Sequence, residues 1–109
     1  SILEDRFGKI SQEMEIYMYE EWFEKLARKL EIKKVKQTKT MIDLELSENI
    51  SKLINGEELF MLAYEISKNF KLNYKDNKIH IILEIYNLDK HFLIYIIELL
   101  TKLIKNLDF

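Results

Sequence analysis

The chain has 109 residues, a length that normally forms one domain around one hydrophobic core. Hydrophobic residues make up 48% of it and aromatic residues 12%, which argues against intrinsic disorder. Its 17 basic and 19 acidic side chains leave a formal net charge of -2, which argues against a dedicated nucleic-acid binder. Cysteine is absent, so disulfides and thiolate metal sites are excluded.

The sequence indicates neither a membrane span nor a phosphate-binding loop. Its most apolar stretch, residues 92–97, is far shorter than the roughly 20 residues that cross a bilayer, and no signal peptide is recognisable. The two glycines, Gly8 and Gly56, stand in no G-x-G or G-K-[ST] context. We therefore expect a cytoplasmic domain that touches no membrane and binds no nucleotide through such a loop.

Residues 12–30 have the spacing of an amphipathic helix, and Ser11 is placed to cap its N-terminus. At about 100° per residue, one broad face of this helix collects seven apolar side chains that we expect to enter the core. They are Ile16, Tyr19, Trp22, Phe23, Leu26, Ala27 and Leu30.

Two strand-like runs follow, at residues 33–37 and 40–46, with a turn at Thr38 and Lys39. The second run alternates cleanly between apolar and polar residues, which is typical of a half-buried strand. Its apolar face carries Ile42, Leu44 and Leu46. Residues 47–54 form a connector that can hold a helical turn.

A second helix is expected to begin at Asn55, with Glu58 placed to bond back to the cap. Its apolar stripe holds Leu59, Leu62, Ala63, Ile66 and Phe70. A second hairpin then turns at Asp76 and Asn77, two residue types that tolerate a positive φ. Its return strand places four apolar residues on one face: Ile79, Ile81, Leu83 and Ile85.

The last helix is expected to be capped by Asn87 or Asp89 and to run to about Asn106. Its wide apolar arc consists of Phe92, Leu93, Ile96, Ile97, Leu99, Leu100, Leu103, Ile104 and Leu107. The element order α-ββ-α-ββ-α predicts an α+β fold, in which three helices pack on an antiparallel sheet made of two β-hairpins. We expect residues 1–109 to form a single domain.

We predict no catalytic, cofactor-binding or metal-binding residues. The two histidines, His80 and His91, have no second ligand at helical metal spacing and no obvious nucleophile beside them. Asp43 and Glu45 share a strand face, and paired carboxylates can perform acid–base chemistry. Solvated strand positions explain this pair fully, so we interpret it as structural.

Residues 25–39 are locally basic, and contact with DNA phosphates is the alternative function that they suggest. Glu24 and Glu31 interrupt the region, and no aromatic residue is interleaved for base stacking, so a solvated surface is favoured. Its basic residues are Lys25, Arg28, Lys29, Lys33, Lys34, Lys36 and Lys39.

Five apolar residues fall off the main faces of their helices and form a candidate partner interface. Met14, Tyr17 and Met18 lie opposite or beside the apolar stripe of the first helix. Ile94 and Tyr95 lie among polar residues of the last helix. Aromatic residues and methionine are enriched in protein interfaces. The alternatives are that isolated exposed apolar residues are ordinary, or that the fold covers these residues internally.

Residues 2–10, ILEDRFGKI, resemble the LxDRFG signature that follows the motor domains of bacterial transcription-repair coupling factors. Residues 23–32, FEKLARKLEI, are similar to the LAxKLGI stretch of the same family, and the NGEEL and KIHI segments at 55–59 and 78–81 follow in the family's order. Two positions depart from the pattern, because Ser11 replaces a usual proline and Glu31 a usual glycine. Without that glycine we expect the first helix to end in some other way.

The resemblance implies that the chain is the C-terminal domain of a larger, ATP-driven DNA translocase. That protein displaces stalled RNA polymerase from DNA and recruits UvrA for nucleotide-excision repair. In the family this domain is neither the motor nor an enzyme. It packs on a UvrB-like module of the same chain, covers the UvrA-binding surface and restrains the translocase.

Overall fold

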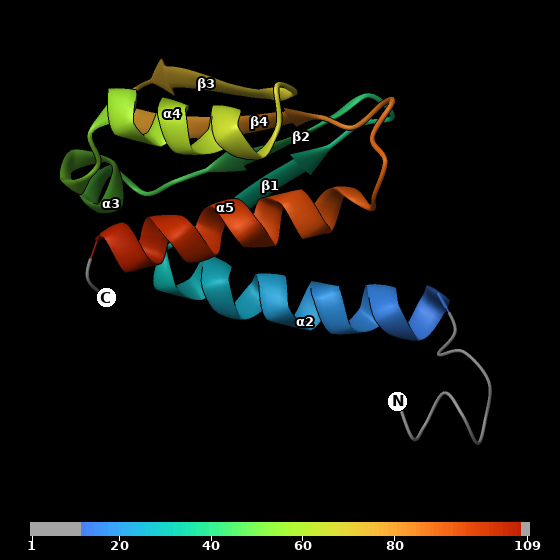
Figure 1. The fold of residues 1–109 in the computed structure, drawn as a ribbon. Coiled ribbons are helices and arrows are strands. Elements are labelled where there is room, and N and C mark those ends of the chain that lie inside the picture. Colours follow the sequence, from blue (N-terminus) through green and yellow to red (C-terminus); the bar gives the residue numbers. More distant parts are fainter. Residues whose placement is uncertain (1–11, 108–109) are drawn as a thin grey trace.

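The structure is a computed structural model that describes residues 12–107 (Figure 1). The predicted helix cap Ser11 and the family signature at residues 2–10 lie outside the described residues. The elements are α2 (Gln12–Lys29), β1 (Lys34–Gln37), β2 (Met41–Glu45), α3 (Glu48–Leu53), α4 (Gly56–Ile66), β3 (Phe70–Lys75), β4 (Lys78–Glu84) and α5 (Phe92–Asn106).

The predicted α+β fold and its two hairpins are confirmed, with one added element. The connector at residues 47–54 holds a separate helix of six residues, α3. Ser47 caps this helix, since its hydroxyl oxygen accepts a hydrogen bond from the backbone N–H of Ile50 at 3.1 Å. The element order is therefore α-ββ-α-α-ββ-α.

The four strands form one antiparallel sheet in the order β1-β2-β4-β3, so the two hairpins meet through β2 and β4. In this central pair Ile42 lies opposite Leu83 and Leu44 opposite Ile81. All four side chains are buried. One face of the sheet thus belongs to the hydrophobic core, and the other, called the open face below, carries mainly charged and polar side chains.

The helices form layers against the apolar face of the sheet. In Figure 1, α4 lies against the sheet, α5 crosses below it, and α2 lies on the far side of α5. The predicted arc of α5 is confirmed as the centre of the core. Its buried side chains are Leu93, Ile96, Ile97, Leu99, Leu100, Leu103 and Ile104.

The two hairpin turns differ in how well the sequence predicts them. Asp76 and Asn77 both adopt a positive φ, 54° and 64°, which confirms the predicted two-residue turn. The first turn is one residue longer than predicted, because β2 begins at Met41. The hydroxyl oxygen of Thr38 holds this turn by accepting backbone hydrogen bonds from Met41 at 3.1 Å and Thr40 at 3.3 Å.

Two local predictions are wrong. Phe70 does not continue the stripe of α4; that helix ends at Ile66 and Phe70 is the first residue of β3. The last helix is capped neither by Asn87 nor by Asp89. Its N-cap is His91, whose Nδ1 accepts a hydrogen bond from the N–H of Leu93 at 3.2 Å.

The end of α2 also differs from the prediction. Glu31 adopts the left-handed conformation, with φ 53°, that the family's glycine would favour. The N–H of Ile32 bonds to the carbonyl of Ala27 at 2.9 Å, and the N–H of Glu31 to that of Arg28 at 3.2 Å. These two bonds define a Schellman motif. The helix therefore ends as it would with glycine, although a glutamate pays the steric cost.

Candidate interaction surface

Helix α2 carries apolar side chains on two opposite sides. On one side Leu26 and Leu30 are buried in the core. On the other side Met14, Tyr17 and Met18 are 56%, 61% and 59% exposed, so the fold does not cover them internally. Their spacing of i, i+3 and i+4 places them next to one another on the helix surface.

Trp22 extends this exposed group, which corrects its predicted place in the core. It is 51% exposed, and it follows Met18 by one further turn of the helix. The prediction assumed that the core covers a broad face of α2. In the described part of the chain α5 is the main neighbour of α2, and a single helix covers a narrower stripe. We call Met14, Tyr17, Met18 and Trp22 the α2 surface.

The hydroxyl group of Tyr17 is fixed along the helix. It donates a hydrogen bond to Oε1 of Glu21 at 2.8 Å. This hydrogen bond, together with the negative charge of Glu21, raises the pKa of Tyr17 above its usual value of 10.0. The side chain therefore offers a neutral, oriented aromatic ring, the kind of group that is enriched at protein interfaces.

The other two predicted interface residues lie closer to the core. Tyr95 is half-buried against the hydrophobic core. For this residue, the alternative that the fold covers it internally is therefore correct. Ile94 is also half-buried, and it lines a mostly apolar hollow of about 350 Å³ between α2 and α5. Trp22 and Tyr19 line the same hollow. The structure thus brings Ile94 next to the edge of the α2 surface and leaves Tyr95 in the packing.

A second group of exposed apolar residues lies on α4 and β3. None of these residues is among the predicted interface residues. Phe60, Met61 and Tyr64 on α4 are 49%, 67% and 55% exposed, and Tyr74 on β3 is 62% exposed. The sequence pattern that could have indicated this group is the same as for α2, namely apolar residues outside the buried stripe of a helix. These α4 residues fall off the helix's core stripe, whose buried members are Leu59 and Ala63.

The carboxylates Asp43 and Glu45 meet His80 on the open face of the sheet. Nδ1 of His80 lies 3.0 Å from Oδ1 of Asp43, and Nε2 lies 3.8 Å from Oε1 of Glu45. Glu45 is the direct cross-strand neighbour of His80. Among the described residues, no group of three or more His, Cys, Asp or Glu is arranged to hold a metal ion. These contacts join β2 to β4, in line with the structural interpretation.

The basic region at residues 25–39 is divided by the fold. Its side chains belong partly to α2 (Lys25, Arg28 and Lys29) and partly to the first hairpin (Lys33, Lys34, Lys36 and Lys39). On β1, Lys34 lies opposite Glu45 and Lys36 opposite Asp43. Opposite charges facing each other across strands stabilise a sheet and reduce the local positive charge. The nucleic-acid alternative remains a prediction, which titration with duplex DNA at two salt concentrations would check.

No protein-family model matches this sequence, and no curated protein matches it. The four-stranded antiparallel sheet with its helices is, however, a known fold. A structure search matches it at TM-score 0.73 to the crystal structure of the C-terminal domain of transcription-repair coupling factor. The match has 12% sequence identity and covers 96% of this chain. It confirms the resemblance at the level of the fold.

The chain spans 65% of the length of that solved domain. Among the described helices, none combines the length and apolar character that crossing a membrane requires.

Proposed function

We propose that this chain is a regulatory protein-interaction domain of a transcription-repair coupling factor. In this proposal the domain packs on a UvrB-like module of its parent protein and covers the surface that binds UvrA. It also restrains the ATP-driven DNA translocase of the parent. When a competing partner binds, the domain moves away and both activities are released.

The observation that carries this proposal is that α2 exposes four large apolar side chains outside the stripe that packs against α5. The α2 surface consists of two methionines, a tyrosine and a tryptophan. Tyrosine and tryptophan are frequent hot-spot residues, and methionine adapts to irregular surfaces. The fold of a coupling-factor C-terminal domain, found over 96% of the chain, supports the choice of parent.

A clamp of this kind must be stable enough to hold and weak enough to open. A ligand shifts such an equilibrium only by the difference between its affinities for the closed and open states. Coupling between two sites typically changes affinity about 5–150-fold. A small apolar patch suits this range, because losing one side chain removes much of its contact energy.

The test uses the full parent protein. Met18→Glu places a charge in the centre of the α2 surface, and we expect UvrA affinity to rise about fivefold or more, together with the basal ATPase rate. Complete removal of the domain should give at least the same increase. Leu53→Glu is the matched control, since Leu53 is as exposed on α3 as Met18 is on α2.

Three outcomes are distinguishable. If removing the domain changes neither UvrA binding nor ATPase rate, the masking function is wrong. If removal releases both activities but Met18→Glu releases neither, the function holds and the α2 surface is the wrong contact. If Leu53→Glu acts as strongly as Met18→Glu, the contact surface is not specific to α2.

A further inference from the structure

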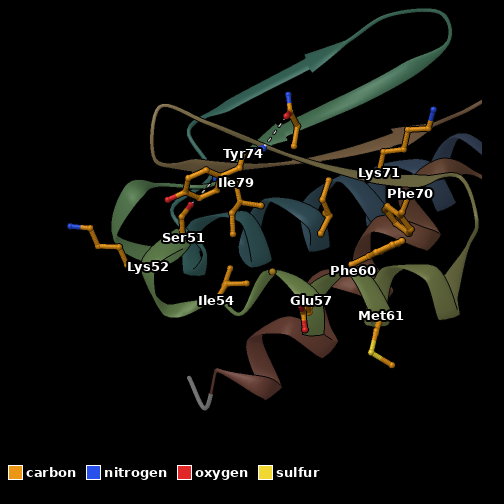
Figure 2. Close-up of a pocket in the computed structure, with 13 residues that line it drawn as sticks. Ser51, Lys52, Ile54, Glu57, Phe60, Met61, Phe70, Lys71, Tyr74 and Ile79 are labelled. Atoms are coloured by element: carbon orange, nitrogen blue, oxygen red, sulfur yellow. Dashed lines mark hydrogen bonds between the residues drawn. The ribbon is translucent and has the colours of Figure 1, made fainter.

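A groove of about 1050 Å³ lies between β3 and the helices α3 and α4 (Figure 2). Leu72, Ile79 and Ile54 contribute buried or half-buried apolar surface to it. Phe60 and Met61 of α4 line it and are largely exposed. The groove is therefore apolar and open to a partner, on a different part of the molecule from the α2 surface.

One wall of the groove is the free edge of the sheet. β3 is an outer strand, and β4 is its one strand neighbour within residues 12–107. The carbonyl of Asn69 accepts a hydrogen bond from the N–H of Glu84 at 3.0 Å. Because hydrogen-bonded positions alternate along an antiparallel ladder, Lys71, Asn73 and Lys75 bond to β4. The backbone groups of Leu72 and Tyr74 therefore point toward the open edge.

A local hydrogen bond from a neighbouring side chain partly occupies this edge. The N–H of Tyr74 donates to Oδ1 of the preceding residue, Asn73, at 3.0 Å. An incoming strand that offers a carbonyl to Tyr74 replaces this local bond. The other edge strand, β1, is less suited to such a partner, because Lys34 and Lys36 already face Glu45 and Asp43 and Val35 is its one apolar residue.

The charges beside the free edge of β3 determine which kind of incoming strand can pair with it. On the open face of the sheet, β3 presents Lys71 and Lys75, and Lys75 lies directly opposite Lys78 of β4. Like charges facing each other across strands are destabilising. Lys71 is paired with Glu84 at 3.3 Å, whereas Lys75 makes no ion pair with any described residue. An acidic side chain next to Lys75 relieves this repulsion.

A second copy of the chain is a poor partner for the same reason. In the antiparallel register that pairs Leu72 of one copy with Tyr74 of the other, Lys71 of each copy lies opposite Lys75 of the other, so this clash occurs twice. Lysine on an edge strand is a known protection against such self-pairing. An occupant that carries the opposite charge therefore fits this edge better than a second copy does.

We propose that the groove binds an extended protein segment that adds to β3 as a fifth, antiparallel strand. In this segment apolar residues alternate with aspartate or glutamate. The apolar side chains enter the groove beside Phe60 and Leu72, and the acidic ones lie beside Lys71 and Lys75. At about 3.3 Å per residue, the six residues of β3 accommodate a segment of about six residues.

The first test uses a capped seven-residue peptide that alternates glutamate with valine, titrated into the nitrogen-15-labelled chain. We expect amide shifts along β3 and α4. A peptide that alternates lysine with valine should bind about tenfold more weakly, because it adds to the positive charge of the edge. Equal affinities of the two peptides, or shifts confined to β1 or α2, would overturn the proposal.

N-methylation of the acidic peptide tests the strand pairing itself. Residues directly opposite each other in an antiparallel pair point their side chains to the same face. The valines, whose side chains share the groove side with Leu72 and Tyr74, must therefore supply the backbone bonds. We expect N-methyl groups on the valines to abolish binding and N-methyl groups on the glutamates to be tolerated. If N-methyl groups on the valines and on the glutamates change the affinity equally, the peptide does not bind as an added strand.

Two pairs of variants locate the site. Phe60→Asp should weaken binding of the acidic peptide about fivefold or more, whereas Leu53→Asp, at a similarly exposed apolar residue that does not line the groove, should not. Lys75→Glu should weaken binding, whereas Lys39→Glu changes the net charge equally at the β1–β2 turn and should have little effect. If either control matches its test variant, the groove is not the binding site.

Discussion

Glu31 occupies a backbone position at which glycine is the favoured residue. Its φ of 53° costs a residue with a Cβ atom about 1–2 kcal/mol, and glycine loses part of this gain to its greater freedom in the unfolded chain. We therefore expect Glu31→Gly to raise the free energy of unfolding by about 1 kcal/mol, measured by urea denaturation.

Glu31→Ala is the control for this prediction. Alanine removes the same charge as glycine but keeps the Cβ atom, so it should leave the stability nearly unchanged. If alanine stabilises the chain as much as glycine does, the effect comes from the charge and the steric account of the Schellman motif is wrong.

Glu84 links the edge strand to the end of β4. The hydroxyl group of Tyr86 donates to its Oε2 at 2.9 Å, and Nζ of Lys71 lies 3.3 Å from its Oε1. These contacts lower the pKa of Glu84 below its usual value of 4.5, with the Tyr86 hydrogen bond as the largest cause. Because the folded pKa lies below the unfolded one, this stabilisation is present above about pH 4.5 and is lost as the pH falls through the folded pKa.

Tyr86→Phe should therefore raise the pKa of Glu84 toward 4.5. The stabilisation that the Glu84 carboxylate provides is then lost at a higher pH as the solution is acidified. Carbon-13 NMR titration of the Glu84 carboxyl group measures this shift. Tyr64→Phe removes a hydroxyl group from α4 and should leave the titration unchanged. An unaltered pKa in the Tyr86 variant would show that Lys71 alone lowers it.

At the scale of elements, α3 is attached to the sheet by a buried serine. Ser51 is 5% exposed, and its Oγ accepts a hydrogen bond from the backbone N–H of Ile79 at 2.9 Å. The carbonyl of Ile79 still accepts from Leu46 at 2.9 Å, where the chain leaves β2 for α3. The side chain of Ser51 thus completes the ladder at the point where β2 ends.

Ser51→Ala should lower the free energy of unfolding by about 1–3 kcal/mol, because it leaves the buried N–H of Ile79 without an acceptor. Hydrogen exchange at the Ile79 amide should accelerate more than exchange at the other amides of β4. Ser51→Thr keeps the acceptor and serves as the control. If the alanine variant is as stable as the original chain, water replaces the hydroxyl group and α3 is held by its apolar contacts.

The sequence predicts elements well where local chemistry decides the outcome. The turn at Asp76 and Asn77 follows from two residue types that accept a positive φ, and the arc of α5 follows from its nine apolar positions. The prediction fails where a neighbour decides. Trp22 falls within the apolar arc of α2, yet only the position of α5 determines that this edge of the arc stays exposed.

The candidate surfaces show the same limit. Met14, Tyr17 and Met18 could be singled out from the sequence because they fall outside the buried stripe of α2, but only the structure shows that no other described element covers them. The groove between β3 and the helices α3 and α4 could not be predicted from spacing, since Phe60 and Tyr74 come to line one groove through the pairing of β3 with β4 and the docking of α4. Such a site depends on the order of strands in the sheet, which periodicity does not contain.

At the scale of the whole molecule, the chain offers two apolar surfaces on different layers. In Figure 1, α2 lies on the far side of α5, whereas α4 and β3 lie at the sheet. The two surfaces share no residue: one consists of Met14, Tyr17, Met18 and Trp22, and the other lines the groove. The proposed contact through α2 therefore leaves β3 open to another protein segment.

This separation predicts that variants at the two surfaces act independently. Energies of substitutions at distant sites with no shared partners usually add to within about 0.5 kcal/mol. Met18→Glu should therefore leave binding of the acidic peptide unchanged to within about twofold, because it alters neither the groove nor the lysines beside it. Isothermal titration of the peptide into the original chain, each single variant and the Met18→Glu, Phe60→Asp double variant measures this. If the double variant loses much more affinity than Phe60→Asp alone, α5 transmits a change from one surface to the other, and partner binding at the groove would then regulate the clamp.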